Sequence, residues 1–526
     1  AETRDVCESC AFTKIAEAIQ ASQNGDLIRI ASGTYSGFDN DTSFGSGYPS
    51  LSIEGGYDVG FASRNGETIL SGVGLQLNPY FVGSVAFDGL TFSGGPSIYV
   101  ASTAANLSVT NCKFDNPSGA AINVAPYYPL AEYPWADRRQ RASTTFTFLN
   151  NQIVANPTAG ALDIYLYTDG AWTATARIEG NSVSGATQEY ASGINYYSNG
   201  PNDSVVIRNN HIFGNKTGLV MQLVGTNAFA DVAYNRVHDN LQYAMRLTNA
   251  PNVDGHYLVH HNRIYSQPMY GVVFSTPGRA AFYNNVFFAN QWVGLKFYGA
   301  SGSPRIVNNI FSEHPRRSLE ITAYETGWGN ARIIPSALRY NNFFNTTPAN
   351  VFFHESLPPA YSYYSEIPGD WNDINQFPWS DGNYSEDPHF VNPGTGDFTL
   401  EADSFCIDEG DPLESFDNEL VPNGARINLG INGNTDSSEA TPAMSSLSNL
   451  VGAQAGDTLR FEFDLSAELS AVWILAEYLS DSGWTAIPPN ELTGSDYVVG
   501  YKAGRIWTGV GRRLVWTGAS SALDGV

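Results

Sequence analysis

The sequence predicts an all-β fold wound as a solenoid of stacked coils, and three observations support this prediction. The phrase apolar-x-x-Asn-x-apolar recurs between about Val85 and Phe344, for example as VVIRNNHIFGN at 205–215 and PRIVNNIF at 304–311. A short strand-like phrase such as GLVMQL or GLKF follows the copies. Charged residues make up only 15% of the 526 residues, whereas 51 residues are glycine and 13% are aromatic. A repeat of this length indicates coils that stack, because one coil cannot bury its apolar face alone.

The Asn of the repeat is predicted to point into the coil and to join one coil to the next. Side chains of a strand alternate between two faces, so a residue at a fixed place in each coil forms a column. A column of amides can bond from coil to coil, which satisfies polar groups that burial would otherwise leave unpaired. Leu90 and Cys112 hold the same place in two earlier copies. The sequence therefore predicts a structural ladder of Asn151, Asn181, Asn210, Asn235, Asn262, Asn285, Asn309 and Asn342.

This pattern resembles the right-handed parallel β-helix family, the scaffold of pectate lyases and polygalacturonases. The resemblance covers about 400 residues and implies the fold rather than an activity, because that scaffold hosts lyases, hydrolases, epimerases, tailspikes and adhesins.

The chain is predicted to divide into four parts, of which the coils at 36–386 are the largest. Residues 1–35 hold a short amphipathic segment, in which Thr13 is expected to cap a helix that buries Ile15 and Ile19. This segment resembles the N-terminal cap of secreted β-helix proteins, which covers the strand edges of the first coil.

Two further parts follow the coils. Residues 387–440 open with DPHFVNPGTGDFTL and resemble the C-terminal cap segment that is common after secreted β-helices. Residues 441–526 alternate polar and apolar residues, as in LRFEFDLS, and resemble an immunoglobulin-like or fibronectin-type-III-like sandwich. Such a sandwich normally ends on one more apolar strand, but here the sequence stops at ASSALDGV. We therefore expect an open edge that a second copy of the chain could fill.

The charge balance limits the classes of partner. A formal charge of −25 argues against nucleic acid and against anionic membranes. It also disfavours an anionic polysaccharide, unless calcium or a local basic patch intervenes. Acidic loops at 39–43, 408–411 and 432–436 make Ca²⁺ the one cofactor to consider, but none has the full spacing of a recognised calcium loop, so a solvated acidic surface is the default explanation.

The location is predicted to be extracellular or at the cell surface. No apolar run reaches the length of a membrane span, and the sequence begins at Ala1, as a processed export product would. Cys7 and Cys10 are expected to form a local disulfide, since no His follows them for haem attachment and no second CxxC exists for a zinc ribbon. Cys112 is expected to be a buried thiol, and its pairing with Cys406 is left open.

The outward face of the second strand family holds the candidate catalytic residues Lys296, Arg246, Asp163 and Glu320. A glycosidase needs two carboxyl groups within roughly 5–10 Å. Asp163 and Glu320 are six coils apart, roughly 29 Å at the usual strand spacing, which excludes that pair. A lyase could use Lys296 and Arg246, two coils apart, although Lys296 could equally pair with Glu320.

Two sets of residues are candidates for ligand binding. Tyr165, Tyr197 and Tyr298 on the same outward face could stack on sugar rings, although exposed tyrosine is also ordinary on a sheet. His211, Arg236 and Arg263 form a basic row on the first strand family. This row could bind a sulfated or carboxylated ligand, or it could contact an acidic neighbour in an assembly; it is a poor zinc site, because its histidines are scattered.

The leading hypothesis is an exported structural or surface protein that self-associates, for example into a filament or layer by strand exchange, or that binds glycans. Insertions at 125–142, 322–337 and 354–386 are rich in aromatic residues, and such loops can stack on sugars or pack against a partner. The alternative is a polysaccharide lyase or glycoside hydrolase of the β-helix type. The predicted partners are copies of the chain and extracellular polysaccharide, without nucleic acid and without membrane insertion.

Overall fold

The structure is a computed structural model. It describes the whole chain except residues 37–42, 45–48, 73, 79–80, 96–97, 103, 126–142, 168–172, 250–254, 277, 300, 324–331, 347–349, 356–374, 376, 422, 425, 440–445, 456–457, 467–470, 475–476, 481–482, 488–491, 495–496, 499–503, 508 and 517–526.

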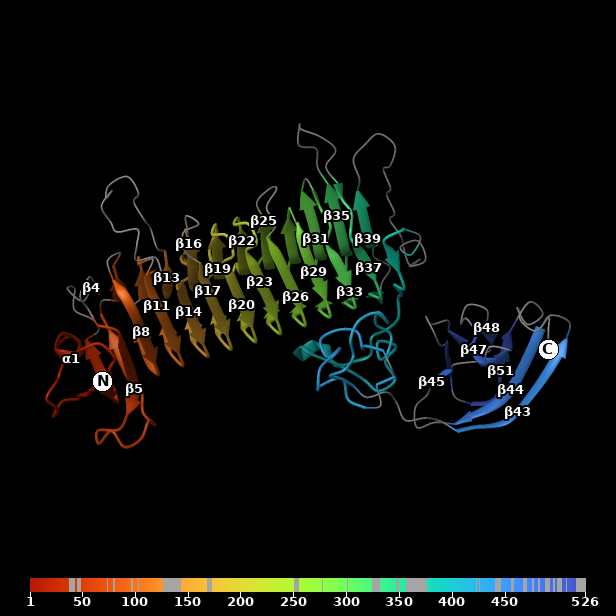
Figure 1. Cartoon of the computed structure of the whole chain (residues 1–526), viewed down its shortest axis with the longest axis horizontal. Coiled ribbons are helices and arrows are strands. Elements are labelled where there is room, and N and C mark those ends of the chain that lie inside the picture. The colour runs from red at the N-terminus through yellow and green to blue at the C-terminus, as the bar shows by residue number, and fades with distance from the viewer. Residues whose placement is uncertain are drawn as a thin grey trace.

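The predicted all-β solenoid is confirmed: the chain winds as a right-handed parallel β-helix with three sheets, A, B and C, visited in that order in each coil (Figure 1). Sheet A consists of β1 (Thr3–Val6), β2 (Asp26–Ala31), β5 (Leu51–Tyr57), β8 (Val82–Asp88), β11 (Ala104–Thr110), β14 (Thr144–Leu149), β17 (Ala174–Glu179), β20 (Ser204–Arg208), β23 (Phe229–Ala233), β26 (His256–His260), β29 (Arg279–Tyr283), β33 (Arg305–Val307), β37 (Ala337–Arg339) and β40 (Ser380–Asp381).

The strands of sheet B are short and follow those of sheet A. They are β3 (Gly33–Ser36), β6 (Thr68–Ser71), β9 (Leu90–Ser93), β12 (Lys113–Asp115), β15 (Gln152–Val154), β18 (Ser182–Ser184), β21 (His211–Phe213), β24 (Arg236–His238), β27 (Arg263–Tyr265), β30 (Val286–Phe288), β34 (Ile310–Ser312) and β38 (Asn342–Phe344).

Sheet C closes each coil. Its strands are β4 (Ser43–Phe44), β7 (Leu75–Leu77), β10 (Ile98–Val100), β13 (Ile122–Val124), β16 (Leu162–Leu166), β19 (Ser192–Ser198), β22 (Thr217–Leu223), β25 (Tyr243–Asn249), β28 (Tyr270–Ser275), β31 (Val293–Gly299), β35 (Arg317–Ala323) and β39 (Asn350–Glu355). A small pair, β32 (Ser301–Gly302) and β36 (Arg332–Ile333), lies after sheet C.

The repeated phrase of the sequence forms two strands, with a sharp turn between them. In VVIRNNHIF the strand β20 ends at Arg208 and β21 begins at His211, and Asn209 between them has φ of +56°. Asn visits this left-handed region more readily than most residues, so it turns the chain sharply from sheet A to sheet B. The same position in other coils is held by Asn111, Asn150, Gly180, Tyr234, His261, Asn284, Asn308 and Tyr340, all with positive φ.

Columns of apolar side chains fill the interior of the coils. The inward residues of sheet A are fully buried in register from coil to coil, and in sheet B Phe311 stacks between Phe287 and Phe343 with ring centroids 4.7 and 4.9 Å away. This burial is the main source of stability, because each coil covers the apolar face of the next. The column in sheet A consists of Ile178, Ile207, Val232, Val259, Phe282, Ile306 and Leu338.

The N-terminal helix α1 (Ile15–Ala21) buries Ile15 and Ile19, as predicted, but its N-cap differs. Lys14 holds that position, and no side chain caps the helix, so the expectation for Thr13 is wrong. Cys7 and Cys10 form a disulfide before it. No helix in the described part of the chain has the length and hydropathy that crossing a bilayer requires.

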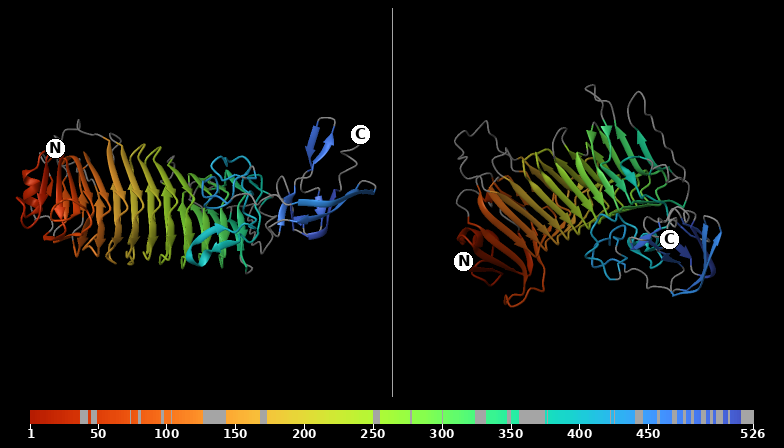
Figure 2. Two further views of the ribbon diagram at one scale, coloured as in Figure 1. Left: turned by 90° about the horizontal axis from the view of Figure 1, so that it is seen from below. Right: turned by 45° about the vertical axis from the view of Figure 1, so that its right-hand side comes forward.

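Residues 387–439 fold back along the outer face of sheet B. They contain β41 (Phe390–Asn392), the 3₁₀ helix η3 (Pro393–Thr395) and β42 (Asp397–Leu400), which lie beside the last coils in both views (Figures 1 and 2). Their apolar residues form a second buried cluster with sheet B, made of Phe390, Phe398, Leu400, Cys406, Ile407, Leu429 and Ile431 against Tyr265, Val286 and Ile310. Because this segment covers outward residues of sheet B, we call residues 387–439 the sheet B cover.

The described strands after residue 445 pair antiparallel. One sheet has the order β43 (Ser446–Ala455), β44 (Thr458–Ser466), β51 (Gly509–Trp516) and β48 (Leu492–Gly494); the others hold β45 (Ala471–Ile474), β50 (Gly504–Trp507) and β49 (Tyr497–Val498), and β46 (Glu477–Ser480) with β47 (Gly483–Ala486). The resemblance to an immunoglobulin-like sandwich stays a prediction. The last residues, on which the expectation of an open edge rests, lie outside the described part.

Candidate functional site

The Asn column forms a continuous ladder inside the coils. Asn262, for example, donates from Nδ2 to Asn285 Oδ1 at 3.0 Å and to the Val232 carbonyl at 2.8 Å, and its own Oδ1 accepts from Asn235. The ladder runs through Asn151, Asn181, Asn210, Asn235, Asn262, Asn285 and Asn309, then continues to Asn341, Asn383 and Asn375.

Asn342 is therefore not a member of the ladder, contrary to the prediction. It is the first residue of β38 and points outward, where its Nδ2 donates to the Glu386 carbonyl and its Oδ1 accepts from the Glu386 amide. The repeat has two adjacent Asn residues here, and the left-handed residue Tyr340 places the inward position at Asn341. The sequence does contain a signal for this choice, because Leu338 and Phe343 complete the apolar-x-x-Asn-x-apolar phrase around Asn341, whereas Asn342 would place Arg339 in its first apolar position.

A second ladder at the corner between sheets B and C was not predicted. Its members lie five residues after those of the first ladder, as with Asn215 after Asn210, which is a signal that the sequence contains. Asn215 Nδ2 donates to Asn240 Oδ1 at 3.2 Å, and the column continues through Gln267, Asn290 and His314. Both ladders are structural, since their members are buried, except for the half-buried Asn375 at the end of the first.

The outward face of sheet C carries one row, mostly of polar and charged residues with two valines, across consecutive strands. Its members are Asn123, Asp163, Asn195, Val220, Arg246, Val273, Lys296 and Glu320, in the order that the sequence predicts. A parallel row begins with Tyr165 and Tyr197 and reaches Tyr298. Arg246 is exposed and lies two strands from Lys296, about 10 Å at the usual strand spacing.

Lys296 and Glu320 form the centre of a charged cluster. Lys296 Nζ lies 2.6 Å from Glu320 Oε1, and Arg317 Nη1 lies 2.7 Å from Glu320 Oε2. Burial by itself would raise the pKa of Glu320, but hydrogen bonds and charge from Lys296 and Arg317 lower it overall. Glu320 is thus an ionised partner of two cations and is unsuited to donate a proton.

Aromatic rings flank this cluster. Lys296 Nζ lies 5.9 Å from the centroid of the Tyr270 ring, and Tyr270 stacks on Tyr243 at 5.3 Å. Trp292 lies edge-on to Tyr270 at 5.5 Å, remains 40% exposed, and has the Arg316 guanidinium 5.4 Å from its ring. Exposed rings beside cations are the side chains that stack on sugars and pair with their acidic groups.

Asp163 lies at the other end of the row. Burial raises its pKa to about 6, and Asn195 opposes that shift by a hydrogen bond. Asn195 Nδ2 also donates to the Tyr165 hydroxyl at 2.6 Å, and Tyr197 lies 5.1 Å from Tyr167. Five strand steps separate Asp163 from Lys296, about 24 Å, so the structure does not bring the four candidate catalytic residues together.

The basic row on sheet B lies in part beneath the sheet B cover. His211, Arg236 and Arg263 occupy consecutive strands. Arg236 Nη2 donates to the Thr395 carbonyl of the cover at 2.7 Å, and its Nε donates to the Tyr265 hydroxyl at 2.6 Å. Burial lowers the pKa of Arg263, while the Asp397 charge of the cover opposes that change. The acidic residue beside this row is therefore Asp397 of the same chain, rather than a residue of another molecule in an assembly. Arg236 already pairs with the cover and is not a free ligand-binding residue.

A pair of histidines remains beside this contact. His211 Nε2 lies 2.7 Å from His238 Nε2, and His238 Nδ1 lies 2.7 Å from an Asp239 carboxylate oxygen. Burial, with the charges of His238 and Arg236, lowers the pKa of His211 to about 4. Burial also lowers the pKa of His238 against the effect of Asp239.

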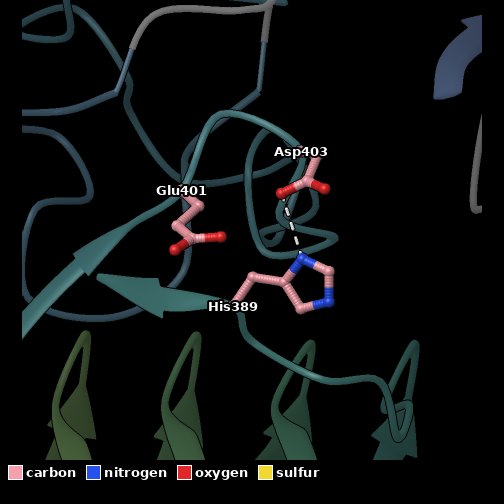
Figure 3. A group of neighbouring side chains, drawn as sticks. All are labelled: His389, Glu401 and Asp403. Carbon is pink, nitrogen blue, oxygen red and sulfur yellow. Dashed lines mark hydrogen bonds and ion pairs between the residues drawn. The ribbon is translucent and has the colours of Figure 1, made fainter. Parts of the chain in front are cut away.

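A third group belongs to the sheet B cover itself. His389 Nδ1 lies 3.0 Å from Asp403 Oδ1, and Glu401 lies beside them, so that one ligand atom from each residue is within 4.8 Å of the other two (Figure 3). Within the described part of the chain this is the one group of three or more His, Cys or acidic residues with that spacing. The sequence gives little sign of it, since the three residues belong to the segment that resembles a C-terminal cap, and that resemblance implies no metal site.

The loops considered for calcium are engaged in other contacts where the structure describes them. Glu409 pairs with Arg426 at 3.2 Å, and Asp411 pairs with Arg339 at 3.0 Å. Burial, with the charges of the neighbouring carboxylates, raises the pKa of Glu419 to about 7. These contacts help to fix the fold of the cover.

The comparisons with known proteins concern mainly the coils. Residues 137–333, less than half of the chain, match a sequence family described as "Periplasmic copper-binding protein (NosD)". No curated protein matches the sequence. Among solved structures, the periplasmic alginate epimerase AlgG is similar at 11% identity with a TM-score of 0.43, over 68% of this chain and 76% of that chain. The pectate lyase Pel9A is similar at 13% identity with a TM-score of 0.36, over 82% of this chain and 96% of that chain.

The residues within the matched range can be tested against copper, which favours imidazole and sulfur donors. Met221 and Met245 are fully buried in the coil interior, Met269 is partly buried, and both free cysteines, Cys112 and Cys406, lie outside this range and are buried. The imidazole pair of His211 and His238 does fit, because two nitrogens converge and Asp239 orients one ring from behind, as second-shell carboxylates do.

Proposed function

We propose that this chain is an exported β-helix protein whose sheet C surface binds an acidic polysaccharide. The observation that carries the proposal is the cluster of Tyr243, Tyr270, Trp292, Lys296, Arg317 and Glu320 on one outward face. Export, to the periplasm or beyond, is consistent with the disulfide and with the periplasmic description of the matched family.

Local charge supports an acidic ligand despite the acidity of the whole chain. Arg246, Lys296, Arg316 and Arg317 lie on or beside the face, and Glu320 is the carboxylate that Lys296 and Arg317 share. These cations would attract a bound ligand over a few ångströms, whereas salt screens the attraction or repulsion by the more distant negative charges of the chain. A ligand carboxylate could replace Glu320 in pairing with Arg317 or pair with the exposed Arg246.

The parallel strands also suit an extended ligand. Equivalent side chains repeat at about 4.8 Å along sheet C, so a polysaccharide could contact several strands at once. The second row adds Tyr165, Tyr197 and Tyr298 as further stacking surfaces. Binding rather than cleavage is favoured, because Glu320 is held ionised and Asp163 is about 24 Å from Lys296.

The test is a binding and turnover assay with acidic and neutral polysaccharides. We expect acidic polymers such as alginate or polygalacturonate to bind, and Lys296→Ala and Tyr270→Ala each to weaken binding about tenfold. Lys113→Ala, which removes a cation from sheet B, and Tyr190→Ala, which removes a ring that is 94% exposed in a turn, are the matched controls. Equal binding by all four variants would refute the site, and release of unsaturated or reducing ends would favour the lyase or hydrolase alternative.

Copper binding by His211 and His238 is a second candidate function, favoured by their convergent Nε2 atoms. Copper bound there would take both imidazoles as ligands, and Asp239 would keep the His238 ring oriented. Isothermal titration with Cu²⁺, and with Cu⁺ under reducing conditions, should show one site that the double variant His211→Ala/His238→Ala lacks. An unchanged site in that variant would exclude the pair.

Self-association, the other part of the original hypothesis, stays a proposal that rests on the sequence of the C-terminal strands. Sedimentation of the whole chain over a range of concentrations tests it directly. Polymers that vanish on removal of residues 441–526 would support strand exchange, and a monomer at every concentration would count against it.

A further inference from the structure

Three metal-binding side chains meet at the open end of the β41–β42 hairpin in the sheet B cover. His389 directly precedes β41, Glu401 directly follows β42, and Asp403 comes two residues later. In Figure 3 the imidazole and the two carboxylates face a common space, and the dashed line joins His389 Nδ1 to Asp403 Oδ1 at 3.0 Å.

The spacing is close to that of a cation site. Donors that bind one ion at about 2.0–2.2 Å in a tetrahedron lie roughly 3.3 Å from each other. The His389–Asp403 distance already satisfies this, and all three donors lie within 4.8 Å of one another. Glu401 is exposed, so a rotation of its side chain can bring its carboxylate closer without moving the backbone.

Backbone contacts fix the positions of the three residues without any ion. The Glu401 amide donates to the His389 carbonyl at 2.8 Å, and the His389 amide donates to Asp387 Oδ1 at 3.0 Å. Ser404, next to Asp403, donates from Oγ to the Pro388 carbonyl at 2.6 Å. A preorganised set of donors costs little free energy to assemble around an ion.

We propose that His389, Glu401 and Asp403 bind a divalent transition cation, for which Zn²⁺ is the best representative. One imidazole with two carboxylates is a donor set that Zn²⁺ accepts, with a water molecule in the fourth position. Calcium and magnesium prefer oxygen donors throughout, so the imidazole argues against them. The site lies outside residues 137–333 and is separate from both the polysaccharide face and the His211–His238 pair.

A cation here would fasten the sheet B cover. The two strands that it joins carry Phe390 and Phe398, which pack against Tyr265 and Phe288 of sheet B. Because the ion would hold both ends of the hairpin, its binding would stabilise the covered state and make release of the hairpin depend on metal concentration.

The experiment is Zn²⁺ titration of the full chain carrying His211→Ala/His238→Ala, so that this half-buried histidine pair does not contribute. We expect one equivalent of Zn²⁺ to bind, with a rise in melting temperature of about 2–4 °C at a hundredfold excess over Kd. Adding His389→Ala should abolish this binding, and adding Glu401→Gln or Asp403→Asn should weaken it more than tenfold. Co²⁺ as a spectroscopic probe should give the visible bands of a tetrahedral site.

Controls separate loss of ligands from loss of fold. His256→Ala removes a histidine at the start of β26 and should leave Zn²⁺ affinity unchanged. Circular dichroism and metal-free melting show whether each variant folds, and Glu401→Gln, at an exposed position, should fold normally. Zn²⁺ affinity unchanged in a folded Glu401→Gln and Asp403→Asn variant would overturn the proposal, as would Ca²⁺ binding more tightly than Zn²⁺ through these residues.

Discussion

Sheets B and C present the same kinds of side chain to the outside but use them differently. Both have a row of cations beside aromatic rings, with Arg236 over Tyr265 on sheet B and Lys296 over Tyr270 on sheet C. On sheet B the sheet B cover supplies the partner, as in the bond from Arg236 to the Thr395 carbonyl. On sheet C, Trp292 and Arg246 remain exposed.

This difference shows that residue type and register do not by themselves identify a ligand surface. A row of cations in a solenoid can serve to hold a segment of the same chain, and the distinction appears only when the path of that segment is known. Gly396 illustrates how closely the cover fits: its φ is +78°, and a Cβ there would lie 2.4 Å from the Tyr265 hydroxyl.

The largest expected difference between the two faces is in stability. Phe398→Ala removes a ring that is 1% exposed and packs on Tyr265, Phe288 and Phe390, so we expect a loss of about 3–5 kcal/mol in the local stability of the cover. Trp292→Ala on sheet C should cost less than about 1 kcal/mol but weaken polysaccharide binding. Hydrogen exchange of residues 387–439 and of sheet C measures the two losses of local stability. Equal losses of protection in the two variants would contradict the difference between the faces.

A smaller difference in stability between the two faces should appear at acidic pH, where the sheet B cover should become less stable than sheet C. His261 Nε2 lies 2.8 Å from the Gly433 carbonyl of the cover, and burial, with the charges of His260 and Arg208, lowers the pKa of His261 to about 4. The folded state therefore favours the neutral ring. The stability that comes from keeping this buried ring neutral is complete above about pH 6.5 and is lost as the pH falls toward 4, by about 2 kcal/mol at pH 5. The bond to the Gly433 carbonyl opposes the shift, because it favours the protonated ring.

His261→Asn should remove this acid sensitivity while keeping the turn, because Asn holds the same left-handed position at residues 209, 284 and 308. Hydrogen exchange of the cover between pH 7 and pH 5 tests the prediction, with the sheet C strands as the internal reference. Asp231, Arg208, Tyr234 and Tyr283 also surround the two histidines, so an unchanged pH profile in the variant would assign the acid sensitivity to them.

The smallest expected effect concerns sheet C alone. Because burial raises the pKa of Asp163 to about 6, its ionised form is disfavoured in the folded state, and stability falls as the pH rises through 6. Asp163→Asn should raise the free energy of unfolding by about 1–2 kcal/mol at pH 8 and leave it nearly unchanged at pH 4. Denaturant unfolding at both pH values checks this, and an equal gain at both would show that charge is not the cause.

The coils could be predicted from the sequence because their interactions repeat. Seven of the predicted ladder residues, from Asn151 to Asn309, recur at a fixed place before an apolar residue, and the outward row from Asp163 to Glu320 follows from strand alternation. The error at Asn342 arose where two amides are adjacent and the left-handed residue, Tyr340, is of a type that seldom adopts that conformation.

The contacts of the sheet B cover could not be predicted in the same way. His389 meets Asp403, and Arg236 meets Thr395, through the path of a segment that has no repeat, and the second of these contacts joins residues 159 positions apart. Such long-range contacts depend on the packing of Phe390 and Phe398 against sheet B, which alternation of residue types does not encode.

The corner between sheets A and B limits where residues can be inserted into the solenoid. From β14 to β38 a two-residue link joins each sheet A strand to the following sheet B strand, and the buried amide in that link bonds to the next coil. An added residue there would move the amide out of its column. The links from sheet C to sheet A instead range from three residues, as between β28 and β29, to twenty-four, between β39 and β40. Foreign peptides should therefore be tolerated when grafted at that corner, and rejected at the corner that holds the ladder.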